Sequence, residues 1–253
     1  MRTRHIYKLQ YADTDSSRHI RICDLERYLL EAGGESADLM GIGTDYLLKE
    51  YNCAWVLTRV SIIMDDLPMY LDKLVIETWV EQNAHMLSIR NYRLYIAEDK
   101  SVNAETHDYS KLKLIGQCNS IWTLLNLETR AVDIRCFNDP KWDEIIDGEK
   151  LNMPRASRLG HIATPTSTMQ HTIHYTDLDY NNHCNSCKYT QFMLNACDAL
   201  TAQWPVRFDI NYSKEVHKGE LITVQVEQTK DNIRYCILTE KGEISCTGML
   251  QKQ

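Results

Sequence analysis

The sequence predicts an α+β protein in which one folding unit occurs twice. A polar segment with the pattern Y-x-D-x-D-x-x-x-H begins at Tyr11 and again at Tyr175, with every internal spacing unchanged. Each copy leads without a gap into apolar residues at positions i, i+3, i+4 and i+7, which indicates a helix with one buried face. Segments in which apolar and polar residues alternate follow each helix, as in half-buried strands. This order is typical of a helix that covers one face of an antiparallel sheet.

The first copy begins with a short strand, followed by a helix at Ile22–Met40. Gly33 and Gly34 predict an interruption or a kink in this helix, because glycine disfavours the helix interior. The strands of this copy are expected at Tyr7–Tyr11, Ala54–Met64, Leu74–Gln82, Leu87–Ile96 and Gly116–Leu125.

The second copy repeats the order, with its helix around Tyr189–Ala196. Its strands are expected at His171–Tyr175, Arg207–Tyr212, Leu221–Gln228, Arg234–Thr239 and Ile244–Gln251. Residues 136–165 hold three of the five prolines and predict a linker, with a short helix near Trp142–Ile146. The expected organisation is an N-terminal unit at 1–135, this linker, and a C-terminal unit at 166–253.

The bulk properties are those of a soluble globular chain. The 253 residues are 43% hydrophobic and 25% charged, and the formal charge of −7 argues against general nucleic-acid binding. We find no stretch near the roughly 20 apolar residues of a membrane span, and no apolar signal run at the N-terminus. The nine scattered cysteines fit reduced thiols. We therefore expect a cytoplasmic protein.

The second polar segment carries the richer set of functional groups. Asp179, Asn181 and His183 alternate, so their side chains can share one side of a short extended segment or turn. They precede a helix whose first amides lack intrahelical partners and can stabilise negative charge. A simpler interpretation makes Asp179 and Asn181 helix N-caps. Asp177 is expected to cap or pin the turn.

The first copy has Ser17 at the position of the asparagine. We therefore expect one working site, in the second copy, and structural roles for Asp13, Asp15 and His19. Cys184 and Cys187 form a single C-x-x-C pair. One such pair is weak evidence for a metal or redox site, so we expect two thiols at the helix start and no metal.

Five motifs, spread over nearly the whole length, resemble those of the acyl-acyl-carrier-protein thioesterases. They are WVLTR at Trp55–Arg59, D-x-x-x-x-x-T-W at Asp72–Trp79, W-x-x-x-N-x-x-T-R at Trp122–Arg130, DLDYNNHCNSCKY at Asp177–Tyr189 and YSKEV at Tyr212–Val216. The resemblance implies a tandem (double) hot-dog fold, in which an antiparallel sheet wraps each long helix. It also implies hydrolysis of the thioester between a fatty acyl chain and the phosphopantetheine arm of acyl carrier protein (ACP), without a cofactor.

The resemblance adds Glu215 to Asp179, Asn181 and His183 as the catalytic set. Asn181, His183 or the helix amides would donate to the developing oxyanion, and loss of one such donor commonly costs about 10² to 10³ in rate. Asp179 would activate water or attack the carbonyl carbon, and Glu215 would orient His183 or the water. Family members often carry cysteine after this glutamate. Val216 stands there instead and excludes a cysteine nucleophile at this position.

The resemblance also gives the N-terminal unit an acyl-binding role. Met40, Trp55 and Met86 are candidate tunnel residues, although each is more often an ordinary core residue. The basic pairs are expected to be solvated charges, any of which could meet an acidic carrier protein: Arg90 with Arg93, Lys111 with Lys113, and Arg155 with Arg158. An acyl-coenzyme A thioesterase of the hot-dog class and a non-catalytic acyl-binding protein stay open as alternatives, and so does a homodimer.

Overall fold

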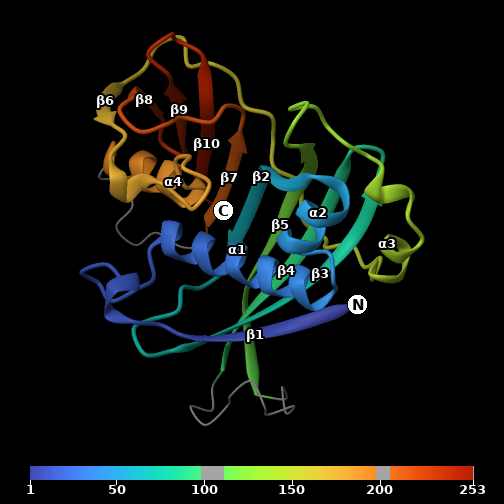
Figure 1. Ribbon diagram of the computed structural model, residues 1–253. Helices are drawn as coiled ribbons and strands as arrows, with labels where there is room; N and C mark the ends of the chain where they lie inside the picture. Colours follow the sequence, from blue (N-terminus) through green and yellow to red (C-terminus); the bar gives the residue numbers. More distant parts are fainter. Residues whose placement is uncertain (98–110, 198–205, 253) are drawn as a thin grey trace.

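In the part of the chain that the structure describes, ten strands form one antiparallel sheet (Figure 1). The computed structural model describes residues 1–97, 111–197 and 206–252. The N-terminal strands are β1 (Arg2–Lys8), β2 (Cys53–Met64), β3 (Lys73–Ala84), β4 (Leu87–Ala97) and β5 (Leu112–Asn126). The C-terminal strands are β6 (Ser167–Thr172), β7 (Val206–Tyr212), β8 (Leu221–Gln228), β9 (Asn232–Leu238) and β10 (Ile244–Lys252).

The strand order divides the sheet into two similar halves. It reads β1-β3-β4-β5-β2-β7-β10-β9-β8-β6, so the halves meet where β2 pairs with β7. At this junction Val60 lies opposite Ile210, and both side chains enter the core. Among the described residues, each half is a five-stranded sheet with one long helix against it, and α2 (Thr44–Tyr51) also contacts β2 in the N-terminal half. The predicted tandem hot-dog architecture is therefore confirmed.

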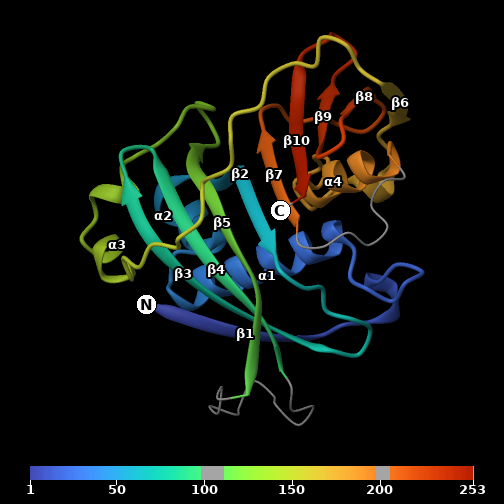
Figure 2. The ribbon, with the colours of Figure 1, turned by 180° about the vertical axis from the view of Figure 1, so that it is seen from behind.

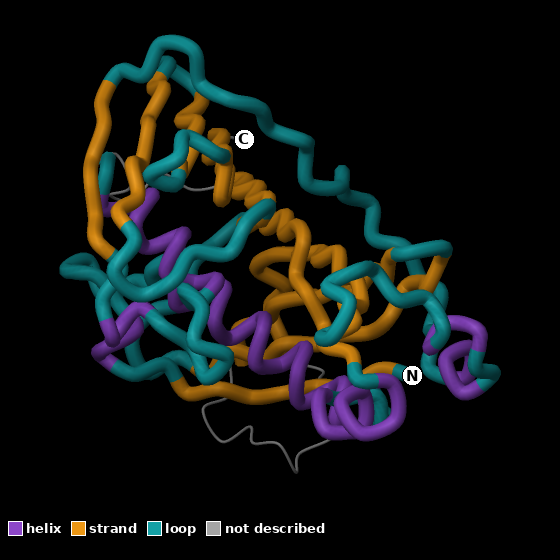
Figure 3. The backbone as a smooth tube through the Cα atoms, turned by 45° about the horizontal axis from the view of Figure 1, so that its top comes forward, coloured by secondary structure: helices purple, strands orange, loops and turns teal. Residues whose placement is uncertain are grey.

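The two long helices lie on the same face of the sheet and contact each other (Figures 1 and 3). Helix α1 (Ile22–Leu39) buries Leu25 and Leu29, and α4 (Ser186–Asn195) buries Phe192 and Met193 in the same core. The spacing of these residues confirms the predicted amphipathic pattern. The other helices among the described residues are α2 (Thr44–Tyr51), α3 (Lys141–Glu144) and the short 3-10 helices η1 (Tyr11–Asp13), η2 (Cys136–Asn138) and η3 (Tyr175–Asp177).

Several predicted boundaries were wrong. Strand β1 starts at Arg2, and Tyr11 lies in η1 instead of a strand. Helix α1 runs without interruption through both glycines. A Cβ atom on Gly33 would lie 2.7 Å from the hydroxyl oxygen of Tyr92, so this glycine permits a close approach to β4. In the second copy, β6 ends at Thr172 before the chain enters η3.

The linker crosses the outer face of the sheet, opposite α1 and α4 (Figure 2). Its carbonyl groups accept hydrogen bonds from side chains of successive strands. The Trp79 indole donates to the Glu149 carbonyl (2.9 Å), and the Asn211 amide donates to the Ser157 carbonyl (2.8 Å). The linker therefore joins the outer faces of both halves.

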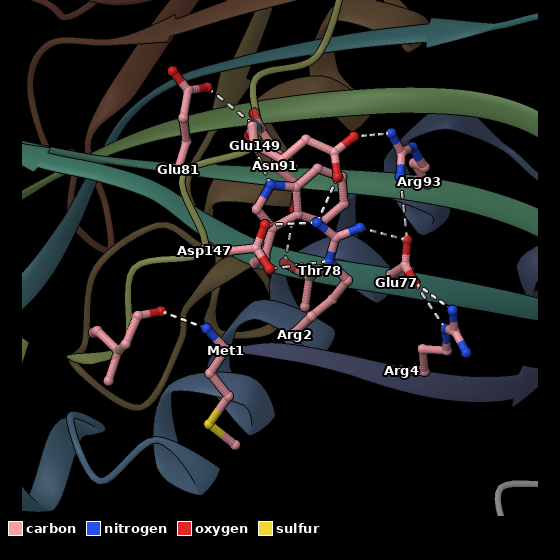
Figure 4. Close-up of polar contacts among 12 residues, drawn as sticks. Met1, Arg2, Arg4, Glu77, Thr78, Glu81, Asn91, Arg93, Asp147 and Glu149 are labelled. Carbon is pink, nitrogen blue, oxygen red and sulfur yellow. Dashed lines mark hydrogen bonds and ion pairs between the residues drawn. The ribbon is translucent and has the colours of Figure 1, made fainter. Parts of the chain in front are cut away.

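A network of charges holds the middle of this linker against β1, β3 and β4 (Figure 4). The guanidinium of Arg2 donates to Asp147 (2.6 Å) and Glu149 (2.5 Å) and stacks over the Trp79 ring at 4.2 Å. The hydrogen bond from Arg2 lowers the pKa of Glu149. Glu77, which is 2% exposed, accepts from Arg4 at 2.8 Å. Several charges that share partners in one network hold the linker on the sheet more firmly than isolated surface pairs would.

One backbone position differs between the two copies in a way that predicts a stability change. The Leu71 amide donates to the Leu9 carbonyl, and the Gly219 amide donates equivalently to the Ile173 carbonyl. Both residues adopt a left-handed backbone conformation, with φ of 73° at Leu71 and 88° at Gly219. Replacing the exposed Leu71 by Gly should relieve this strain and raise the free energy of unfolding by about 1 kcal/mol. Urea denaturation measures the change.

The matched control is Leu71→Ala, which removes the same apolar side chain but keeps a Cβ atom. It should show no such gain. A Leu71→Gly protein less stable than the Leu71→Ala protein would contradict this account.

Candidate active site

Each copy of the repeat pins its polar turn with a buried aspartate. Asp177 accepts a hydrogen bond from the His174 amide (2.9 Å) and lies 2.9 Å from Nε2 of His171. In the first copy, Asp13 accepts from the Gln10 amide (2.8 Å). The predicted structural roles of Asp177 and Asp13 are thus confirmed.

Asp179 organises the tight turn that carries Asn181 and His183. Its Oδ1 atom accepts hydrogen bonds from the amides of Asn181 (2.9 Å) and His183 (3.2 Å). Its own amide donates to the His183 carbonyl (2.9 Å), and the turn closes through Asn182 at a φ of 63°. Among the residues that the structure describes, none donates to Oδ2 of Asp179. That oxygen is available to a ligand.

The N-cap interpretation of Asp179 and Asn181 was wrong. Helix α4 is capped by Asn185, whose side chain accepts from the Cys187 amide at 3.0 Å. Asn181 lies exposed in the turn. Its side chain forms no hydrogen bond within the described ranges, so its amide can meet a substrate.

Glu215 reaches this turn from the loop that follows β7. The Cys184 amide donates to the Val216 carbonyl (2.9 Å), which fixes the loop beside the turn. Oε1 of Glu215 lies 3.4 Å from Nδ1 of His183. The side chains of Glu215 and His183 are 38% and 28% exposed, so solvent reaches both. The structure therefore brings together Glu215 and His183, which lie far apart in sequence.

Arg130 completes the cluster from the N-terminal half, and our sequence reasoning gave it no role. Its guanidinium donates to Oε2 of Glu215 at 2.8 Å. The turn that presents it follows β5 and is held by Asn126, whose Oδ1 accepts from the Thr129 amide (3.0 Å). These residues form the N-x-x-T-R end of the motif at Trp122–Arg130. The motif itself was the signal that pointed to them.

The first copy cannot form the same cluster. Its Ile20 amide donates to the Pro68 carbonyl (3.0 Å), which matches the Cys184–Val216 hydrogen bond of the second copy. The residue before Pro68 is Leu67, which is 6% exposed and replaces the glutamate. An aliphatic side chain therefore stands where the second copy has a carboxylate.

The polar groups of the first turn also bond to one another. The Ser17 hydroxyl donates to Oδ1 of Asp15 (2.6 Å) and lies 3.0 Å from Nδ1 of His19. The two copies therefore share a backbone design but differ in chemistry, as the serine substitution had suggested.

The C-x-x-C thiols lie at the start of α4, as expected. Cys184 is 6% exposed, and burial raises its pKa to about 12. Burial also raises the pKa of Cys187 well above its ordinary value. Neither thiol is a reactive thiolate near neutral pH.

The candidate tunnel residues divide into two groups. Met40 and Trp55 belong to an apolar cluster that also contains Trp142, whose ring lies 5.6 Å from that of Trp55. Met86 is 55% exposed in the β3–β4 hairpin. Its candidacy as a tunnel residue was therefore wrong.

The expectation of solvated charge was wrong for two of the basic residues. Arg90 is 6% exposed and donates to the Ser36 hydroxyl at 2.9 Å, and burial lowers its pKa. Arg155 binds the buried carboxylate of Glu81 at 2.5 Å. Lys113 pairs with Asp66 and Arg93 with Glu149, whereas Lys111 and Arg158 are exposed.

A hollow of about 530 Å³ lies between the end of α2 and the turn after β5. Its walls include Lys49, Glu50, Asp133 and Arg135. So polar a lining does not suit a fatty acyl chain, which needs apolar walls. We therefore do not assign this hollow to the acyl group.

The chain is a duplicated hot-dog protein with one polar turn that carries the richer set of groups, and comparison with known proteins identifies its family. Residues 1–135 match the acyl-ACP thioesterase N-terminal domain, and residues 162–251 match the acyl-ACP thioesterase C-terminal domain. The chain belongs to the acyl-ACP thioesterase family.

Relatives and solved structures agree with this family. The chain is 22% identical to the chloroplastic palmitoyl-acyl carrier protein thioesterase of Arabidopsis thaliana, over 87% of this chain and 52% of that protein. The corresponding protein of Gossypium hirsutum is 24% identical, over 85% and 51%. The chain thus spans about half the length of the curated relatives it matches.

Two solved structures share the fold over nearly the entire chain. An acyl-ACP thioesterase from Bacteroides thetaiotaomicron superposes with a TM-score of 0.84 at 24% identity, over 99% of this chain and 97% of that one. The 12:0-ACP thioesterase from Umbellularia californica superposes with a TM-score of 0.82 at 15% identity, over 99% of this chain and 96% of that one. Within the described residues, no helix is both long and apolar enough to cross a membrane.

Proposed function

We propose that this protein hydrolyses the thioester of fatty acyl-ACP and releases a free fatty acid. One observation carries the proposal. The second copy alone combines the Asp179 turn, an exposed Asn181, and a glutamate 3.4 Å from the turn histidine. The family to which the chain belongs supports the same reaction.

In the proposed mechanism, Glu215 holds His183 with a proton on Nδ1, which leaves Nε2 facing the reacting groups. Arg130 keeps the Glu215 carboxylate in place through its hydrogen bond of 2.8 Å. Nε2 takes a proton from the attacking water and later returns it to the departing sulfur. A thiol with a pKa of about 8.5 is a good leaving group, so little acid assistance is needed.

Asn181 donates to the carbonyl oxygen as negative charge develops on it. Asp179 contributes its free Oδ2 atom, either by polarising the water or by attacking the carbonyl carbon. In the second route an acyl-aspartate anhydride forms, the thiol departs, and water then releases the acid. After a single turnover in ¹⁸O-labelled water, label in Asp179 would establish the second route, because water that attacks the aspartyl carbon of the anhydride leaves its oxygen there.

We propose that the C-terminal unit, residues 166–253, supplies this chemistry and that the N-terminal unit, residues 1–135, binds the acyl chain. The apolar cluster around Met40 and Trp55 supports the second assignment, because it lies in the N-terminal half. The nine free cysteines support a reducing compartment such as the cytoplasm.

The decisive experiment compares turnover of one acyl chain on ACP and on coenzyme A, repeated over several chain lengths. We expect a higher kcat/KM for the ACP thioester, because the carrier protein adds contacts that coenzyme A lacks. A preference for coenzyme A would favour the acyl-coenzyme A thioesterase. Release of no free acid from either donor would leave a non-catalytic acyl-binding protein.

A further inference from the structure

The loop after β7 places a third metal-binding side chain beside His183 and Glu215. Val216 is fully buried, with 0% exposure, and its carbonyl accepts from the Cys184 amide. Its two neighbours in sequence therefore turn to the opposite, accessible side. The ring of His217 lies 5.0 Å from that of His183, centroid to centroid, at an interplanar angle of 78°.

We propose that His183, Glu215 and His217 form a binding site for Zn²⁺, and that zinc bound there reversibly inhibits thioester hydrolysis. The inhibition rests on the function proposed above, because two of the three ligands belong to the proposed catalytic set. The binding of zinc does not depend on that function.

The geometry is close to that of a zinc site. One ligand atom from each side chain lies within 4.8 Å of the other two. Zinc–ligand bonds of roughly 2.0–2.2 Å in a tetrahedron place ligand atoms about 3.3 Å apart. The His183–Glu215 separation of 3.4 Å already meets this requirement. His217 is exposed, so rotation of its side chain can bring its ring nitrogen to the same distance from the ligand atoms of His183 and Glu215.

The ligand chemistry also favours zinc over harder cations. Two imidazoles and one carboxylate are a common protein ligand set for Zn²⁺, with water in the fourth position. Magnesium prefers near-octahedral oxygen ligands and is not expected to bind here. Zinc at this site withdraws His183 from proton transfer and Glu215 from its orienting role, which accounts for inhibition.

Two features of the chain supply internal controls. The first copy has Leu67 and Met69 at the positions of Glu215 and His217, so one zinc ion per chain is expected. Arg130 places a positive charge on the same carboxylate, at 2.8 Å, and opposes a cation. Its removal should therefore strengthen binding.

The test uses Co²⁺ as a spectroscopic substitute for zinc, titrated into the full chain and displaced by Zn²⁺. We expect one equivalent to bind, with the visible bands of nitrogen and oxygen ligands and without a thiolate charge-transfer band. His217→Gln should weaken binding by at least about tenfold, the lower bound seen when even an outer-shell partner of a metal is lost. Arg130→Gln should tighten it.

Activity on acyl-ACP provides the second measurement. Zinc should inhibit the wild-type protein, EDTA should restore it, and His217→Gln should resist zinc by the factor lost in binding. Thiolate bands, equal cobalt affinity in His217→Gln, or activation by zinc would each overturn the proposal. Cobalt binding that needs His217, in a protein without thioesterase activity, would refute the proposed function and leave the metal site standing.

Discussion

Asp179→Asn is expected to lower kcat on acyl-ACP by roughly 10² to 10⁴-fold while leaving the fold intact. The reason is that the two oxygens of Asp179 have separate tasks. Oδ1 accepts hydrogen bonds from the backbone amides of Asn181 and His183. The side-chain carbonyl oxygen of an asparagine can accept the same hydrogen bonds. The free Oδ2 becomes an amide nitrogen, which can neither attack the thioester nor attract a proton from water.

The matched control lies in the other copy of the repeat. Asp15 accepts the amides of Ser17 (2.8 Å) and His19 (3.2 Å) through Oδ1, in the same turn geometry. Asp15→Asn should therefore keep nearly full activity, although it makes an equivalent change. Single-turnover kinetics measure both variants, and thermal unfolding checks their folding. Equal loss in the two variants, or no loss in Asp179→Asn, would show that the aspartate serves the turn alone.

The fold could be predicted where the alternation of residues reflects burial on one side of the sheet. Strand β8 runs from Leu221 to Gln228, as expected, because its apolar residues face the core in every second position. Strand β1 was misplaced because its outward residues Arg2 and Arg4 enter the charged network on the outer face. Such a segment has too few apolar residues to show the alternation that is typical of a strand.

The site was predictable only in part, because its members come from segments that sequence spacing does not connect. Asp179, Asn181 and His183 lie in one turn, so a local pattern was enough to find them. Glu215 required the family resemblance, since nothing local in YSKEV indicates chemistry. Arg130 belongs to the N-terminal half, and its contact with Glu215 depends on how the pairing of β2 with β7 places the two halves.

The burial of Glu26 could not be predicted from the apolar pattern of its helix. It is 0% exposed, although its neighbours on α1 predicted a helix with one polar face. Helix α4 covers this second face. Oε2 accepts from the Thr190 hydroxyl at 2.5 Å, and Oε1 accepts from the Tyr212 hydroxyl. Thr190 is the counterpart of Glu26 in the repeat, so the two copies bond through equivalent positions.

This burial predicts a second large effect, on the pH dependence of stability. Burial raises the pKa of Glu26 from 4.5 to about 7. The folded state therefore holds its proton more tightly than the unfolded state does. The protonated Glu26 therefore adds about 3 kcal/mol to the free energy of unfolding when the pH is below its pKa in the unfolded chain. This contribution is lost as the pH rises through its pKa in the folded protein.

Glu26→Gln should remove this dependence, because the amide stays neutral. The Gln amide can donate to the Tyr212 hydroxyl, which in turn can donate to the Ser186 carbonyl, now 3.5 Å away. We expect the stability of Glu26→Gln relative to wild type to grow by about 2 kcal/mol between pH 5.5 and pH 8. Urea unfolding across this range measures the difference.

Glu31→Gln, an exposed change on the same helix, is the control and should track wild type. Parallel profiles for wild type and Glu26→Gln would mean that Glu26 ionises as readily in the folded protein as in the unfolded chain. The contact between the two copies would then tolerate a buried charge. A diverging profile would instead show that protonation of one carboxyl group stabilises the packing of α1 against α4, and hence the joining of the two hot-dog units.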